Sequence, residues 1–368
     1  MRSLAIESLS VRGMRNLAEV DIEPGPRFNV VSGANGQGKT NLLEAIYVLC
    51  TSKSFRTARP GDLVAHGGDV ASVRGRFREE DVAREQSVGV RAGARMVRID
   101  AKRPPTLAAY AVTSPVVLFH PGAVTLSSGS GSERRRLLDR VALHLSTEAL
   151  VAFEGYTRAL RERQRALETR GVGASDLSEW EELVARHGAA LADARAAAAE
   201  KLAAEAIAVF ARIGAAGARL EVGYVRTAPS GVDEYRDELA RRRAQDLRRG
   251  SASIGPHRDD LRIDLDGHPA RGVASQGQHR AIVLALELAE IVTIGRARDV
   301  RPILLLDDVS SELDRERTAA LFAFLREEKG QVFLSTTRAE LIDTGAGTGA
   351  SERRDFEVVA GRFHRVGG

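Results

Sequence analysis

A short segment near the start of the chain combines glycines, a lysine and a threonine at a spacing that suits phosphate binding. Residues 33–40 match the pattern G-x-x-x-x-G-K-[ST]. Glycines let backbone N–H groups face an anion, and the positive end of a following helix adds to the attraction. The lysine of such a loop reaches the β- and γ-phosphates, and the threonine hydroxyl binds Mg²⁺. The pattern predicts a site for ATP and Mg²⁺ made by Gly33, Ala34, Asn35, Gly36, Gln37, Gly38, Lys39 and Thr40.

Two aspartates follow a short apolar run in the last third of the chain. Residues 303–306 are typical of a strand buried on both faces, and Asp307 and Asp308 come next. In open parallel sheets, ligands bind beyond the carboxyl ends of the strands. We expect Asp307 to hold the Mg²⁺ with Thr40, and Asp308 to polarise the attacking water as a general base. Asp308 and Lys39 are therefore the candidate catalytic residues, and the alternative is a pair of acids that cap a turn.

A third segment, Ser275-Gln276-Gly277-Gln278, resembles the signature motif of ABC-type ATPases and precedes a long apolar run. A serine hydroxyl at a helix N-terminus attracts anions, and this one has no obvious phosphate in its own chain. Two chains arranged head to tail would each offer the segment to the γ-phosphate bound by the other. Ser275, Gly277 and Gln278 are therefore candidate nucleotide contacts within a homodimer. Residues 310–314 resemble the D-loop of such ATPases, or they cap the next helix.

Hydrophobic spacing and glycine breaks predict the elements that position these motifs. A β-branched run over residues 27–32 predicts a strand before the glycine-rich loop, and residues 41–50 predict a helix after it. Short alternating segments between residues 56 and 112 predict antiparallel strands at an edge of the same domain. Further strands are predicted over residues 303–306 and 332–334, and helices over residues 278–294 and 315–328.

A helical insertion separates the two α/β parts. Between residues 133 and 213 apolar residues recur at helical spacing, with a break at Gly171 and Gly173. This pattern predicts two antiparallel helices that form a short arm. We therefore expect an α/β fold, a P-loop ATPase head with an inserted α-helical arm, in which residues 1–120 and 246–368 form the head lobes and residues 121–245 form the arm.

Composition limits the class of protein. Apolar residues make up 43% of the chain and charged residues 28%, which argues against a disordered chain. The single cysteine, Cys50, excludes a disulfide framework and a cysteine-based metal site within one chain. The most apolar stretch, residues 281–295, is interrupted by Glu287 and Glu290, so no membrane span is predicted. We expect a soluble protein of a reducing compartment, the cytoplasm.

Nucleic-acid binding has to come from clustered arginines, because 54 basic and 50 acidic residues leave a formal net charge of only +4. The clusters flank the helical insertion and comprise Arg134, Arg135 and Arg136, and then Arg241, Arg242 and Arg243. They are candidates for contacts to the phosphates of duplex DNA. The alternative is a solvated helix face with acidic residues interspersed. No groove with interleaved aromatic residues is evident, so stacking of single-stranded bases is not predicted.

Four stretches together closely resemble the RecF family of bacterial DNA replication and recombination mediators, which is related to SMC-type heads. They are GANGQGKTNLLEAI at 33–46, SKSFR at 52–56, GPHRDDL at 255–261, and SQGQHR at 275–280 with the strand that ends in two aspartates. The segment Arg15-Asn16-Leu17 and residues 118–139 also resemble parts of this family. Arg15, Asn16 and Arg56 either lie near the nucleotide or are solvated, and residues 257–260 form either a polar link or a structural turn.

The resemblance implies an SMC/ABC-type head with a short arm, ATP-dependent homodimerisation and slow, DNA-stimulated hydrolysis. It also implies binding to duplex or gapped DNA together with RecR, and a role with RecO in loading RecA at single-strand gaps. Three features differ from the expected patterns: His120-Pro121-Gly122 lacks the acidic residue that more often follows the proline in the family, no Q-loop glutamine is evident, and a histidine is absent. In ABC heads that histidine senses the γ-phosphate after the strand corresponding to residues 332–334. Here the following residues are Ser335, Thr336 and Thr337.

The alternative function is that of an ATPase subunit of a membrane transporter. Such a subunit shares the P-loop, the signature motif and the aspartate strand. The absent histidine, the helical insertion and the GPHRDD stretch argue against it.

Overall fold

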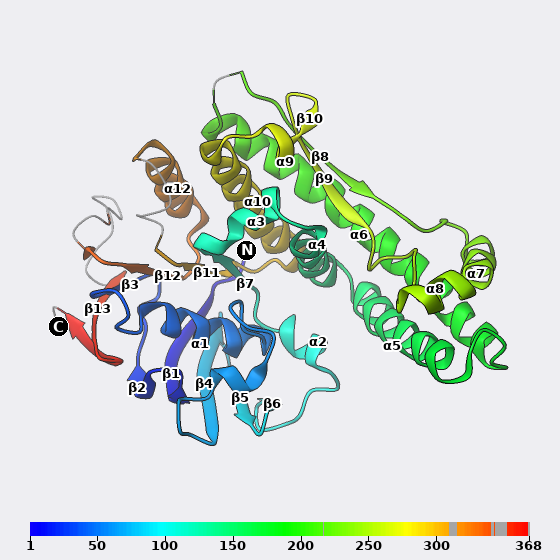
Figure 1. Ribbon diagram of the computed structural model, residues 1–368. Coiled ribbons are helices and arrows are strands. Elements are labelled where there is room, and N and C mark those ends of the chain that lie inside the picture. Colours follow the sequence, from blue (N-terminus) through cyan, green and yellow to red (C-terminus); the bar gives the residue numbers. More distant parts are fainter. Residues whose placement is uncertain (216, 309–314, 340–341, 343–351, 367–368) are drawn as a thin grey trace. The chain divides into compact units, whose positions relative to one another are not determined.

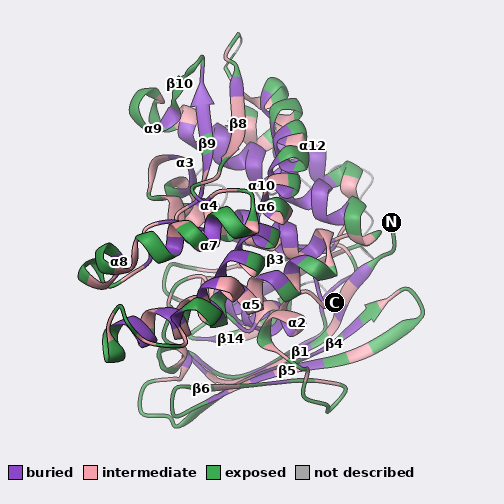
Figure 2. Cartoon of the chain, turned by 90° about the vertical axis from the view of Figure 1, so that its right-hand side faces the viewer, coloured by how far each residue is buried: buried purple, intermediate pink, exposed green. Residues whose placement is uncertain are grey.

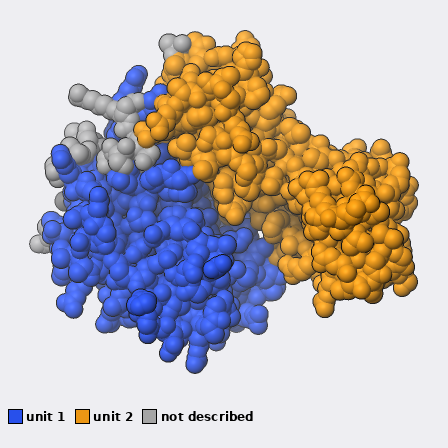
Figure 3. All heavy atoms as spheres, viewed as in Figure 1, with its two compact units in different colours: residues 1–123, 294–368 blue, residues 124–293 orange. Residues whose placement is uncertain are grey.

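The computed structural model describes residues 1–215, 217–308, 315–339, 342 and 352–366 of the chain. The chain divides into two compact units, one of Met1–Ala123 with Ile294–Gly368 and one of Val124–Thr293 (Figure 3). The second unit therefore interrupts the first in sequence. It also contains residues 246–293, which the sequence analysis assigns to the ATPase head.

A six-stranded sheet carries the nucleotide motifs in the first unit (Figure 1). All its neighbouring strands are parallel except β14, which pairs antiparallel with β13. The residues of β11 and β12 are buried, as expected for a sheet covered on both faces. In spatial order the strands are β14 (Arg362–Val366), β13 (Arg353–Val359), β3 (Phe28–Ser32), β12 (Val332–Thr336), β11 (Ile303–Leu306) and β7 (Val116–Phe119).

The strand order brings two distant motifs to one edge of this sheet. Strand β12 lies between β3 and β11, and all three run in the same direction. The glycine-rich loop after β3 and the aspartates after β11 therefore leave the sheet at the same end, one strand apart. The residues that end β12 lie between them.

A five-stranded antiparallel sheet forms the other layer of the first unit. Buried residues alternate with more exposed ones along its strands, so one face lies on the core (Figure 2). This agrees with the antiparallel strands predicted between residues 56 and 112. In spatial order the strands are β2 (Leu17–Ile22), β1 (Leu4–Met14), β4 (Val70–Glu79), β5 (Val82–Arg91) and β6 (Ala94–Ile99).

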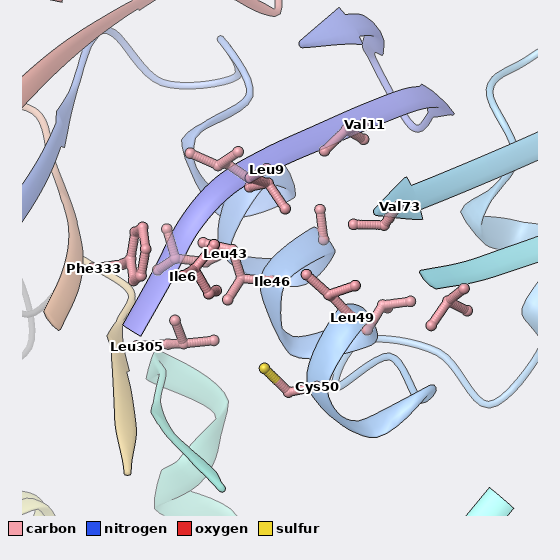
Figure 4. Packing of buried hydrophobic residues seen from close by; sticks show 14 of the residues in the cluster. Ile6, Leu9, Val11, Leu43, Ile46, Leu49, Cys50, Val73, Leu305 and Phe333 are labelled. Atoms are coloured by element: carbon pink, nitrogen blue, oxygen red, sulfur yellow. The ribbon is translucent and has the colours of Figure 1, made fainter. Parts of the chain in front are cut away.

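Helix α1 (Lys39–Thr51) forms the centre of the core of this unit. Its side chains Leu43, Ile46 and Leu49 meet apolar residues of both sheets, such as Val73 and Leu305 (Figure 4). The helix that follows the glycine-rich loop is therefore held rigidly. Short helices α2 (Leu107–Ala111), η1 (Pro60–Leu63) and η2 (Pro121–Val124) and the longer α12 (Arg315–Glu328) complete the described elements of the first unit.

The second unit is mainly helical, as predicted for the arm. Helices α5 (Thr147–Arg170) and α6 (Leu177–Ile213) form a hairpin, with Gly171 at a positive φ of 77° where α5 ends. The other elements are α3 (Thr125–Ser128), α4 (Gly131–Leu145), β8 (Leu220–Val225), α7 (Val232–Arg241), α8 (Arg243–Arg249), β9 (Asp260–Leu265), β10 (His268–Pro269), α9 (Ala270–Val273) and most of α10 (Gln276–Arg298). Among the described helices of the chain, none has the length and hydropathy needed to cross a lipid bilayer.

Candidate nucleotide-binding site

The glycine-rich loop adopts a backbone that only glycine tolerates at two positions. Gly33 has a φ of 151°, and a Cβ there would lie 2.5 Å from the carbonyl oxygen of Val358 in β13. Gly38 has a φ of 120° directly before helix α1 begins. Gln37 ties the loop to the turn between β13 and β14, because its backbone oxygen accepts from the Gly361 N–H at 2.9 Å and its Oε1 accepts from the Ala360 N–H at 2.5 Å. The curled shape of the loop is thus stabilised by contacts with the turn between β13 and β14 as well as by the glycines of the loop itself.

Lys39 points back into this loop. Its Nζ donates to the carbonyl oxygens of Gly33 at 2.7 Å and Ala34 at 2.9 Å, and only 8% of the residue is exposed. Burial lowers the pKa of the Lys39 ammonium, while the carboxylates of Asp308 and Asp307 act in the opposite direction. A phosphate bound in the loop would therefore take the place of the two carbonyl oxygens as the partner of the Lys39 ammonium, and it would offer a full negative charge instead of a carbonyl dipole.

Asp307 accepts hydrogen bonds from two hydroxyl groups of neighbouring segments. Its Oδ1 accepts from Thr40 Oγ1 at 2.9 Å and from Ser335 Oγ at 2.7 Å. Ser335 Oγ in turn accepts from the Asp308 N–H at 3.0 Å. Asp308 has a φ of 52°, a left-handed conformation that aspartate and asparagine tolerate better than most residues.

These oxygens fit the needs of Mg²⁺. The ion prefers oxygen ligands, keeps several waters and is held in proteins by one or two carboxylates together with substrate phosphates. Thr40 and Asp307 supply such a hydroxyl and carboxylate within hydrogen-bond distance of each other. Among the described residues no cluster of three or more His, Cys, Asp or Glu side chains suits a metal. An all-protein metal cage is therefore not found in this part of the chain.

A series of hydrogen-bonded polar side chains borders the glycine-rich loop. It includes Asn16 and Arg56, whose roles are undecided from the sequence. Asn16 Nδ2 donates to the Gly36 carbonyl at 3.3 Å, and Asn41 Nδ2 donates to Asn16 Oδ1 at 2.7 Å. Arg56 donates to Asn41 Oδ1 at 2.7 Å. Asn16 is therefore bonded directly to the loop, and Arg56 is linked to it through Asn41 and Asn16. The spacing of these residues in the sequence does not predict this series of hydrogen bonds.

Buried Glu44 of α1 holds the two segments that contain Arg15 and Arg56. Arg15 makes two hydrogen bonds to its carboxylate, at 3.0 and 2.9 Å, and Ser54 Oγ donates to it at 2.5 Å. Arg56 also approaches this carboxylate, at 3.4 Å. Because Glu44 belongs to α1, these contacts attach the Arg15-Asn16 turn and the 52–56 segment to the helix that follows the loop.

Together these groups line a cavity of about 320 Å³ in the first unit, within the range for small-molecule sites. The lining residues are Asn35, Gly36, Gly38, Lys39, Thr40, Asn41, Arg56, Asp307, Asp308 and Ser335. Most of these residues are predicted from the sequence as site residues. Asn41 and Ser335 are not among those predicted, and the role of Arg56 is undecided from the sequence.

The signature-like segment forms the start of α10 in the second unit. Ser275 Oγ accepts from the Gln278 N–H at 3.3 Å, and Gln278 Oε1 accepts from the Ser275 N–H at 2.7 Å. This reciprocal arrangement is a capping box. Ser275 is exposed and Gly277 is half-buried. The segment therefore presents a capped helix N-terminus at the surface of its unit, while the D-loop candidate, residues 310–314, lies outside the described residues.

Comparisons with known proteins agree over nearly the whole chain. A family model described as the RecF/RecN/SMC N-terminal domain matches residues 5–350. The DNA replication and repair protein RecF of Geobacter sp. (strain M21) is 36% identical over 362 residues, which cover 96% of this chain and 98% of the relative. That of Anaeromyxobacter sp. (strain Fw109-5) is 41% identical over 353 residues, which cover 92% and 94%.

The chain belongs to the RecF family of DNA replication and repair proteins. A solved structure of RecF with ATP, from the RecFOR pathway, matches with a TM-score of 0.87 at 26% identity and covers 99% of this chain and 98% of the other. The Smc head domain of Pyrococcus furiosus matches with a TM-score of 0.57 at 17% identity, which bears on the fold alone. The predicted fold class, an SMC/ABC-type ATPase head with an inserted helical arm, is confirmed.

The GPHRDD stretch that carries much of the likeness to RecF is a structural junction inside the second unit. A Cβ on Gly255, whose φ is 124°, would lie 2.2 Å from the Tyr235 hydroxyl. His257 Nδ1 lies 2.6 Å from the Tyr156 hydroxyl. Asp259 accepts from the N–H and the hydroxyl of Thr227, at 2.8 and 2.7 Å. Of its two predicted roles, the structural turn is the one that these contacts favour.

The first arginine cluster, residues 134–136, makes contacts within the second unit. Arg134 makes two hydrogen bonds to Asp260, at 2.7 and 2.8 Å, and two more to backbone carbonyls, and only 8% of it is exposed. Its guanidinium therefore stabilises the junction and is not presented to DNA. Arg135 is half-buried and donates to the Asp259 carbonyl at 2.9 Å. Arg136 has a side chain that is 65% exposed and pairs with Glu133.

The second arginine cluster, residues 241–243, likewise contains one internally paired arginine and more accessible ones. Arg243 makes two hydrogen bonds to the buried carboxylate of Glu181, which also accepts from the buried Arg163. Arg243 thus belongs to an internal ion-pair network. Arg241 is exposed and Arg242 is half-buried, and both pair with Glu238. Arg136 and Arg241 remain the most accessible of the six candidates.

Proposed function

We propose that this chain is an ATP-binding protein of DNA replication and repair that acts in the cytoplasm as an ATP-dependent homodimer on duplex or gapped DNA. The observation that carries the proposal is the meeting of Thr40, Asp307 and Ser335 beside Lys39, in a cavity of about 320 Å³. RecF relatives aligned over more than nine tenths of the chain, and a RecF structure solved with ATP, support it.

The roles of the residues follow from their contacts. Backbone N–H groups of residues 33–38 and the N-terminus of α1 face the phosphates, and Lys39 exchanges its two carbonyl acceptors for the β- and γ-phosphates. Thr40 and Asp307 hold Mg²⁺, which, when bound, neutralises charge that develops on the phosphates. Ser335 keeps the Asp307 carboxylate oriented, and Arg56 places a further positive charge at the rim.

Hydrolysis is assigned to Asp308 as the general base that takes a proton from the attacking water. Asp308 directly follows Asp307 in the sequence, and its backbone N–H donates a hydrogen bond to Ser335 Oγ. Turnover is proposed to be slow, because the second half of each site comes from another copy. Ser275, Gly277 and Gln278 of that copy offer a helix N-terminus to the γ-phosphate, which adds a positive partial charge where the negative charge is greatest.

DNA contact is proposed for the exposed arginines, chiefly Arg136 and Arg241. Such contacts position a protein on the phosphate backbone without reading sequence. The RecFOR pathway of the solved relative supports RecR as partner, with RecO and RecA loading at single-strand gaps as the outcome. The comparisons do not favour a transporter ATPase, and a cosedimentation assay with gapped duplex against lipid vesicles separates the two functions.

The decisive experiment measures nucleotide affinity and mass together. Wild type and Lys39→Ala are titrated with ATP and Mg²⁺, with binding followed by calorimetry and mass by light scattering, and Lys102→Ala, an exposed lysine outside the cavity, is the control. We expect wild type and the control to bind and to double in mass, and Lys39→Ala to bind at least about tenfold more weakly and stay monomeric. Equal dimerisation of Lys39→Ala and wild type would refute the proposal.

A further inference from the structure

A second cavity, larger than the nucleotide site, lies wholly within the second unit. It has a volume of about 670 Å³ and is formed by facing sides of α4 and α5 together with residues of α6 and the 251–257 segment. We call it the α4–α5 groove. None of the roles assigned above uses its α5 wall.

One continuous face of α5 forms that wall. Lining residues recur at three- or four-residue steps from Phe153 to Glu168, which places them on one side of the helix. The opposite side packs into the hairpin with α6, where Ala152 and Ala159 are buried. The groove therefore exposes helix surface that the α5–α6 hairpin leaves uncovered.

The floor of the groove is apolar. Phe153 and Leu160 are only partly buried and pack against the core of the hairpin, and the ring of Tyr156 lies between them on the same face. Partly exposed aromatic and aliphatic side chains at the bottom of a concave site are the usual anchor points of protein interfaces.

The rim of the groove is basic. Five arginines and two carboxylates line it. One carboxylate, Asp139, is already paired with Arg195 at 2.7 Å, and the other, Glu168, accepts from Gln164 at 2.9 Å. Arg161 and Arg165 are exposed, and their guanidinium groups make no hydrogen bond or ion pair with any described residue. Two unpaired guanidinium groups therefore stand one helical turn apart beside the apolar floor.

We propose that the α4–α5 groove docks an acidic segment of a partner protein, in which an aromatic or aliphatic side chain fills the floor and flanking carboxylates pair with Arg161 and Arg165. Guanidinium groups bind carboxylates through two parallel hydrogen bonds, so the rim suits aspartate and glutamate well. Duplex DNA is a poorer occupant, because its phosphates gain nothing from an apolar floor. The proposal does not depend on the nucleotide site.

The test begins without naming the partner. Peptides displayed on phage are selected against the full-length chain in the absence of nucleotide, and the enriched peptides are synthesised with a fluorescent label. We expect them to combine acidic residues with an aromatic or leucine anchor. Fluorescence anisotropy should show binding at least about tenfold weaker to the double variant Arg161→Glu with Arg165→Glu, whose positions are exposed and tolerate substitution. Leu160→Asp should weaken binding similarly.

Arg158→Glu is the matched control, because Arg158 is an exposed arginine of α5 that does not line the groove, and it should bind the peptides as wild type does. The proposal is overturned if selection gives no excess of acidic residues, or if the double variant binds as tightly as wild type. It is also overturned if a duplex oligonucleotide, or a second copy of the chain, binds through the same two arginines while the peptides do not bind there. Failure here leaves the ATP titration of Lys39→Ala unaffected.

Discussion

Thr40 Oγ1 donates a 2.9 Å hydrogen bond to Asp307 Oδ1, although 267 positions separate the two residues in the sequence. The contact exists because β3 and β11 run parallel with only β12 between them, so the segments after both strands meet at one edge. Ser335, at the end of β12, reaches the same carboxylate oxygen from the middle. The start of α1, the residue after β11 and the end of β12 thus each contribute one oxygen-bearing side chain to a single point.

Ser335→Ala tests the contribution of the middle strand. The substitution removes one of two hydroxyl donors to Asp307 and the acceptor of the Asp308 N–H. A hydrogen bond to a charged group contributes about 1.5–3 kcal/mol, so we expect at least about tenfold higher Mg²⁺ concentrations for half-maximal ATP binding. Thr337→Ala, at an exposed position two residues on, is the control. An unchanged Mg²⁺ dependence in Ser335→Ala would show that Asp307 is oriented by other groups.

Asp308→Asn should separate nucleotide binding from hydrolysis. Asparagine tolerates the left-handed backbone at this position, so the fold should be retained. Without the general base, turnover should fall about a hundredfold or more, and the ATP-bound dimer should persist. Phosphate release and light scattering, measured on the same sample over time, report both effects. Turnover at the wild-type rate would move the general base to another group.

Ser275→Arg should block assembly without harming the nucleotide site of the same chain. Ser275 is exposed at the start of α10, where arginine removes the serine hydroxyl of the capping box and places a long side chain that obstructs a close interface. We expect ATP affinity within about twofold of wild type and no increase in mass with ATP. Ser178→Arg, at an exposed position of α6 in the same unit, is the surface control. Normal ATP-driven dimers of Ser275→Arg would refute a role in trans.

Glu287 makes the stability of the second unit sensitive to pH. Burial raises the pKa of Glu287 well above 4.5, and the nearby Glu290 carboxylate adds to the shift while Arg140 opposes it. Because the folded state holds this proton more tightly than the unfolded state, its contribution to stability is full below about pH 4.5 and is lost as pH rises towards the folded pKa. Glu287→Gln should therefore raise the melting temperature at about pH 8 more than at about pH 5.

Glu290→Gln provides the contrast. Its carboxylate accepts two hydrogen bonds from Arg140, at 2.6 and 2.8 Å. Glutamine weakens this ion pair, in which Glu290 is buried and the Arg140 side chain is 36% exposed, so the variant should melt lower than wild type at both pH values. Equal behaviour of the two glutamine variants would show that the carboxylates are not distinguished by their surroundings.

The sequence predicted the features that depend on short segments. Lys39 and Asp307 were recognisable because each lies in a local pattern that combines strand, turn and helix signals. Ser335 and Asn41 were missed as site residues because their roles arise from strand order and from a chain of side chains across 25 or more positions. The internal pairing of Arg134 was not recognisable for the same reason, since its partner Asp260 lies 126 positions away. A run of arginines looks alike whether its members face solvent or a buried acid.

The hairpin of β13 and β14 has a consequence for synthesis of the chain. Gln37 receives two hydrogen bonds from its turn, at Ala360 and Gly361. A ribosome that has made the first hundred residues has therefore produced every glycine of the loop but not the turn that holds it in shape. The loop gains these two contacts only after residues 360 and 361 have been synthesised.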